Sequence, residues 1–323
     1  MTLNQRSQLE LSERRGVCNG VLVETGAGAR LRLADLIART VAGDPLHLAA
    51  KLSAEETRSF FDWSDLKSVA IEQPGDSSHW HFYKKGHRID PVLLKLVDGD
   101  GRPSAPSIEL LLSQSGTIRL DRVDLRSDPI RTIANRIKEL TGARVRAVAM
   151  GSGGPVHGMP KHYDPVDVIA IQTVGKKNWE LFGRPGAGCG VFRELDKQPN
   201  ELSASIELAE GDILFVPAGL HHRCVARNPS LHIAFTLKWP TLMDVRCESP
   251  EESEALRAME PLRFFGSEER LVQMVIQADR ALRRPMPPDH LVKGVQAWLN
   301  RRDNDAQIEP RDNRPASAVG FAG

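Results

Sequence analysis

Short apolar runs, separated by Gly, Pro and Asp, dominate the middle of the chain. Between residues 143 and 239 seven such runs follow one another: RVRAVAM, VDVIAIQTV, KNWELF, SIELA, DILFVP, RCVAR and LHIAFTL. Apolar runs of this length, bounded by turn-forming residues, are typical of β-strands. Seven short strands in succession predict a β-sandwich or a β-barrel.

Patterns on both sides of this region are mixed. Helical spacing predicts helices over LRLADLIARTVAG, over SAEETRSFFDW, which opens with Ser53 and Glu56, and over SDPIRTIANRIKELTG, which ends at Gly142. Between about 67 and 127 the runs SVAIEQ, HWHFYKKG, PVLLKLVDG, IELLLS and TIRLDRVDL predict strands. Helices return in SPEESEALRAME, SEERLVQMVIQADRALR and PDHLVKGVQAWLNRR.

The expected fold class is therefore mainly β with flanking helices (α+β). An apolar stripe in the C-terminal part, formed by Leu271, Met274, Val275 and Ala278, predicts a packing face or a homodimer interface. The predicted regions are a flexible N-terminus (1–28), an α/β region (29–140), a β core (141–243), a helical module (244–308) and a disordered tail (309–323).

Charge and composition exclude several classes of protein. The chain has 43 Lys and Arg against 42 Asp and Glu, a net charge of +1, which argues against a charge-driven binder of nucleic acid or membrane. The N-terminus lacks the apolar segment of a secretory signal, and a cytoplasmic location is expected. The cysteines form no C-x-x-C pair and are expected to be reduced thiols: Cys18, Cys189, Cys224 and Cys247.

Candidate chemistry begins at the sequence HYDPVDVIAIQTVGKKNW, which starts at residue 162. His162 and Asp164 lie two residues apart at the entrance to a predicted strand, where alternate side chains share a face. One further histidine would complete the two-histidine, one-carboxylate triad that binds Fe(II) and leaves coordination positions open. The segment GDILFVPAGLHHRC offers His221 and His222. The alternative is a hydrogen-bonded surface pair and two loop histidines.

These two segments resemble the Jumonji-C or cupin-type Fe(II)/2-oxoglutarate oxygenases, and within them the ribosomal-oxygenase-like branch. The resemblance is strong over about 140–243 and looser over 30–140, where DPLHLAAKLSAEE is similar to the family's N-terminal segment. It implies a double-stranded β-helix with an N-terminal α/β cover and a C-terminal helical module. The family's second histidine ligand lies five residues after a proline, which counts from Pro217 to His222.

The resemblance also implies the remaining site and the reaction. Lys177, fifteen residues after His162, would bind the distal carboxylate of 2-oxoglutarate, while Lys176 would face solvent. Thr236, in the segment SLHIAFT, is a weaker second candidate for holding the co-substrate. With Fe(II), 2-oxoglutarate and O2, such a site would hydroxylate an unactivated C–H bond of a protein or peptide side chain, releasing succinate and CO2. A ribosomal protein is the branch's usual substrate.

Two positions depart from the ribosomal branch. Val148 and Met150 stand where that branch usually has Asn and Tyr, which leaves the substrate class open. A hydroxylase of small molecules or biosynthetic peptides, or a ligand-binding cupin without activity, are the alternatives. His79 and His81 could form a second metal pair, but no ligand-bearing segment accompanies them; single histidines such as His232 are expected at the surface or in the core.

Overall fold

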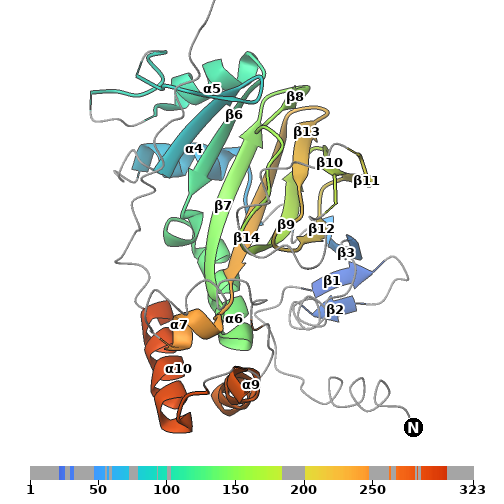
Figure 1. Ribbon diagram of the computed structural model, residues 1–323. Helices are drawn as coiled ribbons and strands as arrows, with labels where there is room; N and C mark the ends of the chain where they lie inside the picture. The colour runs from blue at the N-terminus through green and yellow to red at the C-terminus, as the bar shows by residue number, and fades with distance from the viewer. Residues whose placement is uncertain are drawn as a thin grey trace, which may run out of the picture.

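Two antiparallel sheets pack face to face and form the body of the protein (Figure 1). The computed structural model describes residues 22–25, 30–32, 47–54, 57, 60–72, 79–92, 94–99, 103–183, 201–246, 262, 267–280, 282 and 285–303. Within these residues the larger sheet has the strand order β2 (Arg30–Arg32), β1 (Leu22–Thr25), β3 (His47–Leu52), β12 (Asp212–Val216), β9 (Asp167–Val174), β14 (Ser230–Lys238), β7 (Arg144–Ser152), β6 (Gly116–Asp121), β4 (Trp80–Lys84) and β5 (His87–Ile89). The smaller sheet has the order β11 (Ala204–Leu208), β10 (Lys177–Leu181), β13 (His222–Ala226) and β8 (Val156–His157).

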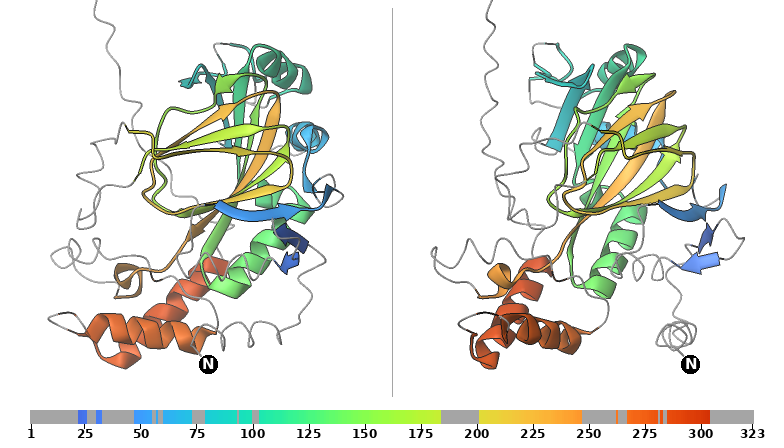
Figure 2. Two further views of the ribbon diagram at one scale, coloured as in Figure 1. Left: turned by 90° about the vertical axis from the view of Figure 1, so that its right-hand side faces the viewer. Right: turned by 45° about the vertical axis from the view of Figure 1, so that its right-hand side comes forward.

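The strands from β7 to β14 form a double-stranded β-helix. Along the chain they alternate between the sheets, apart from β10 and β11, which are neighbours in the smaller one. The central strands of the larger sheet are β12, β9, β14 and β7, and the smaller sheet curls over them (Figure 2). The expected fold class, mainly β with flanking helices, is confirmed, as are all seven strands predicted between 143 and 239.

Burial on both faces explains why the central strands are continuous apolar runs rather than alternating ones. In β9, Ile169 and Ile171 join the core between the larger sheet and the helices, whereas Val168 and Ala170 join the core between the two sheets. The same alternation holds in β12 and β14. Three residues of this second core, Val168, Trp179 and Ala234, also line the pocket of the candidate site described below.

Three of the predicted elements are wrong, and in two of them a cap was missed. SVAIEQ lies largely in helix α4 (Trp63–Glu72), which Asp62 caps by accepting hydrogen bonds from the backbone N–H of Ser64 and Asp65. IELLLS lies in helix α5 (Ala105–Ser113), whose cap Ser104 accepts from the N–H of Ser107. In PVLLKLVDG the described residues form turns and one isolated bridge.

Two N-terminal expectations also change. Residues 31 and 32, at the start of the helix predicted over LRLADLIARTVAG, instead belong to β2 and pair with β1; the rest of that predicted helix lies outside the described residues. Strand β1 falls within the segment 1–28, for which no strand was expected. The predicted helix after Ser53 is supported by the hydrogen bond from the N–H of Thr57 to the carbonyl of Ser53.

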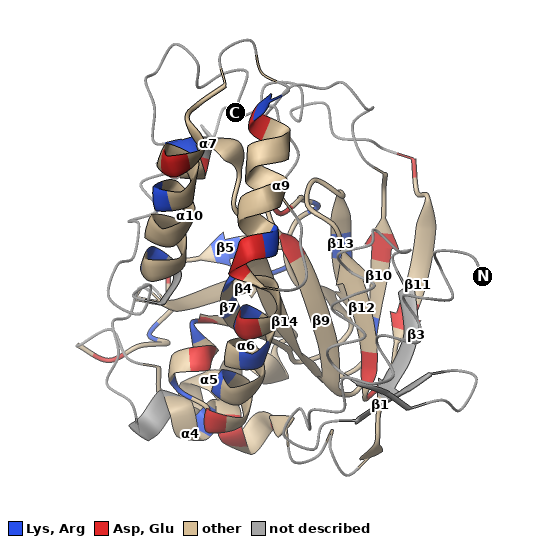
Figure 3. Ribbon diagram, turned by 90° about the horizontal axis from the view of Figure 1, so that it is seen from below, with Lys and Arg blue, Asp and Glu red and all other residues tan. Residues whose placement is uncertain are grey.

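Helix α6 (Asp128–Thr141) follows the short 3-10 helix η2 (Val123–Leu125) and ends at Gly142, as predicted. Beyond the sandwich, α7 (Leu242–Arg246), α9 (Glu268–Arg280) and α10 (Pro288–Asp303) pack together at the end opposite α5 and β8 (Figure 1). Both signs of charge occur on α6, α9 and α10 (Figure 3). The third predicted C-terminal helix, over SPEESEALRAME, lies outside the described residues.

The apolar stripe of α9 packs inside the chain. Leu271 and Val275 are fully buried, and Met274 and Ala278 pack against the same core. A buried ion pair between Arg246 and Asp279 ties α7 to α9. The stripe is therefore a packing face, and a homodimer would need another surface. Among the described residues, no helix is long and apolar enough to span a membrane.

Candidate metal centre

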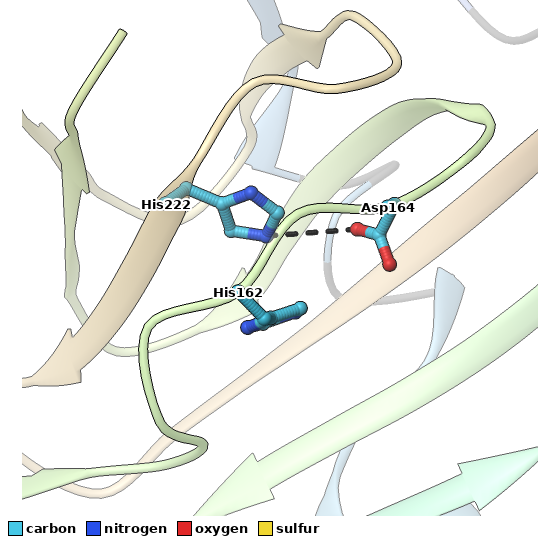
Figure 4. Close-up of side chains that lie close together, drawn as sticks. All are labelled: His162, Asp164 and His222. Carbon is cyan, nitrogen blue, oxygen red and sulfur yellow. Dashed lines mark ion pairs between the residues drawn. The ribbon is translucent and has the colours of Figure 1, made fainter. Parts of the chain in front are cut away.

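Three side chains converge at one end of the β-helix. His162 and Asp164 lie in the segment between β8 and β9, and His222 is the first residue of β13. One nitrogen or oxygen atom from each lies within 4.8 Å of the others, and His222 Nε2 is 3.6 Å from Asp164 Oδ2 (Figure 4). The ring centroids of the two histidines are 4.5 Å apart. The structure thus brings together the three residues predicted to form the triad.

Backbone pairing holds the two histidines next to each other. The N–H of His162 donates to the carbonyl of His222 at 3.0 Å, and the N–H of His222 donates to the carbonyl of His162 at 2.8 Å. This reciprocal pair forms an isolated antiparallel bridge beyond the end of β8. This pair of backbone hydrogen bonds therefore fixes the backbone positions of both histidines relative to each other.

Hydrogen bonds also fix the tautomer of each imidazole. Nδ1 of His162 lies 2.8 Å from the carbonyl oxygen of Pro160, and Nδ1 of His222 lies 3.0 Å from that of Leu220. Because a carbonyl can only accept, each Nδ1 carries the proton and each Nε2 keeps its lone pair. Burial, reinforced by the neighbouring imidazole of His162, lowers the pKa of His222. This neutral form is the one that binds a metal ion.

A tight turn over residues 217–220 positions His222. The N–H of Leu220 donates to the carbonyl of Pro217, and Gly219 at the third position has φ +79°, which is typical of a type II turn. The N–H of Gly219 donates to the carbonyl of Asp164 at 2.9 Å. The turn is therefore hydrogen-bonded directly to the backbone of a residue in the cluster.

Asp167 is hydrogen-bonded to the same turn, and the sequence analysis did not identify this role. Its carboxylate is fully buried and accepts hydrogen bonds from the N–H of Ala218 at 2.7 Å and from the indole of Trp239 at 2.8 Å. The only signal was an acidic residue inside an apolar strand. Since its partners are distant in the chain, its role emerges only from the fold.

His221, the alternative to His222, points elsewhere. Its side chain is buried, its ring lies 5.2 Å from that of Tyr163, and its backbone pairs with the segment 182–183. The cluster contains His222 and excludes His221. The count from Pro217 therefore selects the residue that the structure also places at the cluster.

Lys177 is an unusual buried cation. Its side chain is 2% exposed, and its Nζ donates to the carbonyl of Met150 at 3.3 Å and to Nδ1 of His232 at 2.9 Å. Among the described residues no carboxylate forms an ion pair with it. Burial lowers its pKa from the ordinary 10.5 to about 8. Lys176, by contrast, is exposed and pairs with Glu207, as expected for a solvated lysine.

His232 is the neutral partner of Lys177. Burial, and after it the charge of Lys177, lowers its pKa well below the ordinary value. Because an ammonium can only donate, Nδ1 of His232 is the acceptor and its proton resides on Nε2. The sequence placed His232 only as a surface or core histidine; its role depends on β14 lying beside β7 and opposite β10.

The cluster and Lys177 line one pocket of about 670 Å³, counted out to bulk solvent. Its floor is the larger sheet and its roof is formed by Trp179, whose ring stacks on that of His222 with centroids 5.5 Å apart. Cys224 also lines the pocket, but desolvation raises its thiol pKa to about 12, which keeps it protonated. Thr236 lines the pocket and donates to the carbonyl of Arg146 at 3.3 Å.

The H-x-H pair at residues 79–81 does not form a second cluster. Arg88 donates to Nδ1 of His81, whose Nε2 therefore carries the proton and faces Asp121 at 3.1 Å. Nδ1 of His79 accepts from Arg126. Both nitrogens of His81 are engaged in this network. Within the described part of the chain, the three-residue group at His162 is the one cluster with metal-ligand geometry.

Comparison with known proteins agrees with this geometry. The model of the JmjC domain matches residues 125–245. The chain is 27% identical over 199 residues to the bifunctional lysine-specific demethylase and histidyl-hydroxylase NO66 of Drosophila sechellia, covering 57% of this chain and 30% of that protein. It is 27% identical over 141 residues to a probable ribosomal oxygenase of Haemophilus influenzae, covering 38% and 33%.

Among solved structures, Escherichia coli YcfD, a ribosomal oxygenase in complex with cobalt and 2-oxoglutarate, is similar with a TM-score of 0.44 and 15% identity, covering 93% of this chain and 71% of that one. The chain spans about a third of the length of the two curated relatives. The three clustered residues and Lys177 all fall within the matched segment. The matched part of the chain, residues 125–245, is therefore similar to a JmjC domain.

Proposed function

We propose that this protein is an Fe(II)- and 2-oxoglutarate-dependent oxygenase that hydroxylates a side chain of a protein or peptide. One observation supports this most strongly: two histidines, a carboxylate and a buried lysine with no carboxylate partner among the described residues line the same pocket. The triad provides three ligands on one side of a metal ion and leaves the other side open. Lys177 provides the positive charge that a dicarboxylate co-substrate needs.

The donor set fits Fe(II). Two imidazole nitrogens and one carboxylate oxygen are the ligands of non-haem Fe(II) oxygenases, and Cys224, although it lines the same pocket, is not part of the cluster. The fit to 2-oxoglutarate depends on Lys177, since a buried ammonium without an anion is costly. A bound carboxylate would supply the missing countercharge.

Each residue then has a definite task. His162, Asp164 and His222 would hold Fe(II), with the Nδ1–H bonds to backbone carbonyls orienting both imidazoles. Lys177 would bind the distal carboxylate of 2-oxoglutarate, and His232 would orient the ammonium. When bound, Fe(II) with 2-oxoglutarate and O2 supplies the oxidising chemistry, coupling decarboxylation to succinate and CO2 with insertion of one oxygen atom into a C–H bond.

A protein or peptide substrate is supported by the relatives, whose names describe a histidyl-hydroxylase and a probable ribosomal oxygenase. A ribosomal protein is the first substrate to test. Val148 and Met150 line the floor of the pocket and make it apolar where the ribosomal branch is expected to be polar. This difference is a reason to test other proteins as well.

The activity is tested by measuring succinate formed from 2-oxoglutarate with Fe(II) in air. Turnover should be abolished in Asp164→Ala and should need far more 2-oxoglutarate in Lys177→Met, while the exposed neighbour variant Lys176→Met should match the wild type. Equal turnover in the wild type and Asp164→Ala would exclude the proposed site.

The substrate class is tested by mass spectrometry of total protein from cells with and without the gene. A protein substrate should gain the mass of one oxygen atom only where the gene is present. If no protein changes while a small metabolite or processed peptide does, the enzyme is a tailoring hydroxylase. Purified ribosomes treated with the wild type and with Asp164→Ala should reveal a ribosomal substrate directly.

A further inference from the structure

A second cationic side chain, that of Arg119, lines the same pocket as Lys177. Arg119 lies on β6, directly opposite Met150 of β7, and both side chains line the pocket. On its other side Met150 lies opposite His232 of β14, which binds Lys177. Neighbouring strands lie about 4.8 Å apart, so Arg119 is two strands, or about 10 Å, away from His232. Arg119 is therefore on the side of the pocket away from the expected carboxylate anchor.

A chain of hydrogen bonds holds the guanidinium in place. Its Nε donates to Asp121 Oδ1 at 2.6 Å and its Nη2 to Asp121 Oδ2 at 3.3 Å. The other partners of this carboxylate lead outward, through His81 to the exposed Arg88. Asp121 thus engages one edge of the guanidinium and leaves Nη1 available. Among the described residues, Nη1 makes no hydrogen bond.

The charges in this network do not cancel. The network contains two arginines, Arg119 on the carboxylate of Asp121 and Arg88 on His81, but only this one carboxylate. Burial raises the pKa of Asp121, but the hydrogen bond from His81 and the charge of Arg119 together outweigh burial, so the pKa of Asp121 is lowered overall. Asp164 also contributes to the electrostatic field at Arg119. Arg119 is therefore a positively charged, preorganised donor in the pocket that also holds the metal cluster.

We propose that Arg119 is a specificity-determining residue that donates a hydrogen bond from Nη1 to an acceptor on the target side chain. The enzyme would accept Asp, Asn, Glu, Gln or neutral His residues and discriminate against Lys and Arg. Val148 and Met150 have side chains that donate no hydrogen bond, while the hydroxyls of Ser152 and Thr236 are bonded to Thr117 and to the carbonyl of Arg146. This inference relies on the proposed function, because it concerns the substrate of that site.

The test uses peptide libraries with random flanking sequences and a fixed central residue: Asp, Asn, Glu, Gln, His, Lys or Arg. Hydroxylation of the central residue is measured by mass spectrometry for the wild type, Arg119→Met and the control Arg88→Met, which removes the exposed outer arginine. Loss of one charge-assisted hydrogen bond should lower turnover of the acceptor peptides about 10- to 100-fold in Arg119→Met. Arg88→Met should keep the wild-type ranking.

Arg119→Met removes the arginine partner of Asp121, so the double variant Arg119→Met/Asp121→Asn removes the charge pair as a unit and guards against misfolding. Each variant is first shown to form the Fe(II)/2-oxoglutarate complex anaerobically with the wild-type affinity for 2-oxoglutarate. If the wild type fails this step, the proposed function is wrong. If the complex forms, the inference is overturned by preferred hydroxylation of Lys or Arg, by equal loss across all libraries, by hydroxylation of none, or by weakened 2-oxoglutarate binding in Arg119→Met.

Discussion

Replacing Lys177 by Met should stabilise the metal-free protein while destroying its affinity for 2-oxoglutarate. The ammonium is 2% exposed, lacks an anionic partner among the described residues and has its pKa lowered from 10.5 to about 8 by burial. A shift of this size corresponds to about 3 kcal/mol against the charged form. Losing the hydrogen bond to His232 costs about 1 kcal/mol, which leaves a net gain of about 2 kcal/mol.

The sign of the pH dependence follows from the lowered pKa. Below pH 8 the lysine is charged in both folded and unfolded chains, and the folded state bears the full penalty. Between pH 8 and 10.5 the unfolded chain still holds a proton that the folded chain has released, so the penalty fades as pH rises. The stability advantage of Lys177→Met should therefore be largest at neutral pH and shrink above pH 8.

The assay is urea unfolding of the metal-free wild type and Lys177→Met at pH 7 and pH 9.5, followed by calorimetric titration of 2-oxoglutarate into the Co(II)-loaded proteins. Truncating one partner of a buried charge pair costs about 2–5 kcal/mol, so the Kd for 2-oxoglutarate should rise at least about 30-fold. A variant that is less stable at pH 7 and binds 2-oxoglutarate as tightly as the wild type would refute the reasoning.

Three further substitutions test the supports of the site and of the C-terminal helices. Gly219→Ala should lower the free energy of unfolding, measured in urea, by about 1–2 kcal/mol. The cause is backbone strain at φ +79° alone, because no atom lies within 4 Å of the added Cβ. An unchanged stability would contradict the assigned turn. Asp167→Asn should weaken Co(II) binding in calorimetry about 10-fold, since it loosens the turn that carries His222; unaltered affinity would show that the turn is held by other contacts. Asp279→Ala removes the buried carboxylate that pairs with Arg246, and thermal unfolding should reveal a loss of about 3–5 kcal/mol; a loss below 1 kcal/mol would mean that the ion pair contributes little to stability.

The sequence was most informative where local pattern and tertiary structure agree. Strands buried on both faces, such as β9 and β14, are read directly from their apolar runs. The apolar runs SVAIEQ and IELLLS, which lie in α4 and α5, look as much like strands as the runs of β9 and β14 do. Only the capping residues Asp62 and Ser104 distinguish them as helices. Local hydrogen bonds to the backbone decided those two elements.

The candidate site divides in the same way. His162, Asp164 and Lys177 lie in one segment whose spacing is visible in the sequence. Arg119 and Asp167 acquire their roles only when strands from distant segments become neighbours. Asp167 accepts hydrogen bonds from residues 51 and 72 positions away, and Arg119 lies opposite Met150 in a pocket lined by several strands. Sheet register, which the sequence does not display, decides which of its polar residues meet.

In the proposed site, His222 holds an iron ion together with His162 and Asp164, and 2-oxoglutarate binds to this iron beside Lys177. The most direct measurement is anaerobic titration of 2-oxoglutarate into the Fe(II)-loaded protein, recording the visible charge-transfer band of the chelate, for the wild type, His222→Ala and His221→Ala. The adjacent histidine is the matched control, because it is equally buried and lies outside the cluster. We expect the charge-transfer band in the wild type and in His221→Ala, and no band in folded His222→Ala. A band that survives in His222→Ala, or is missing from the folded wild type, would contradict the proposed site.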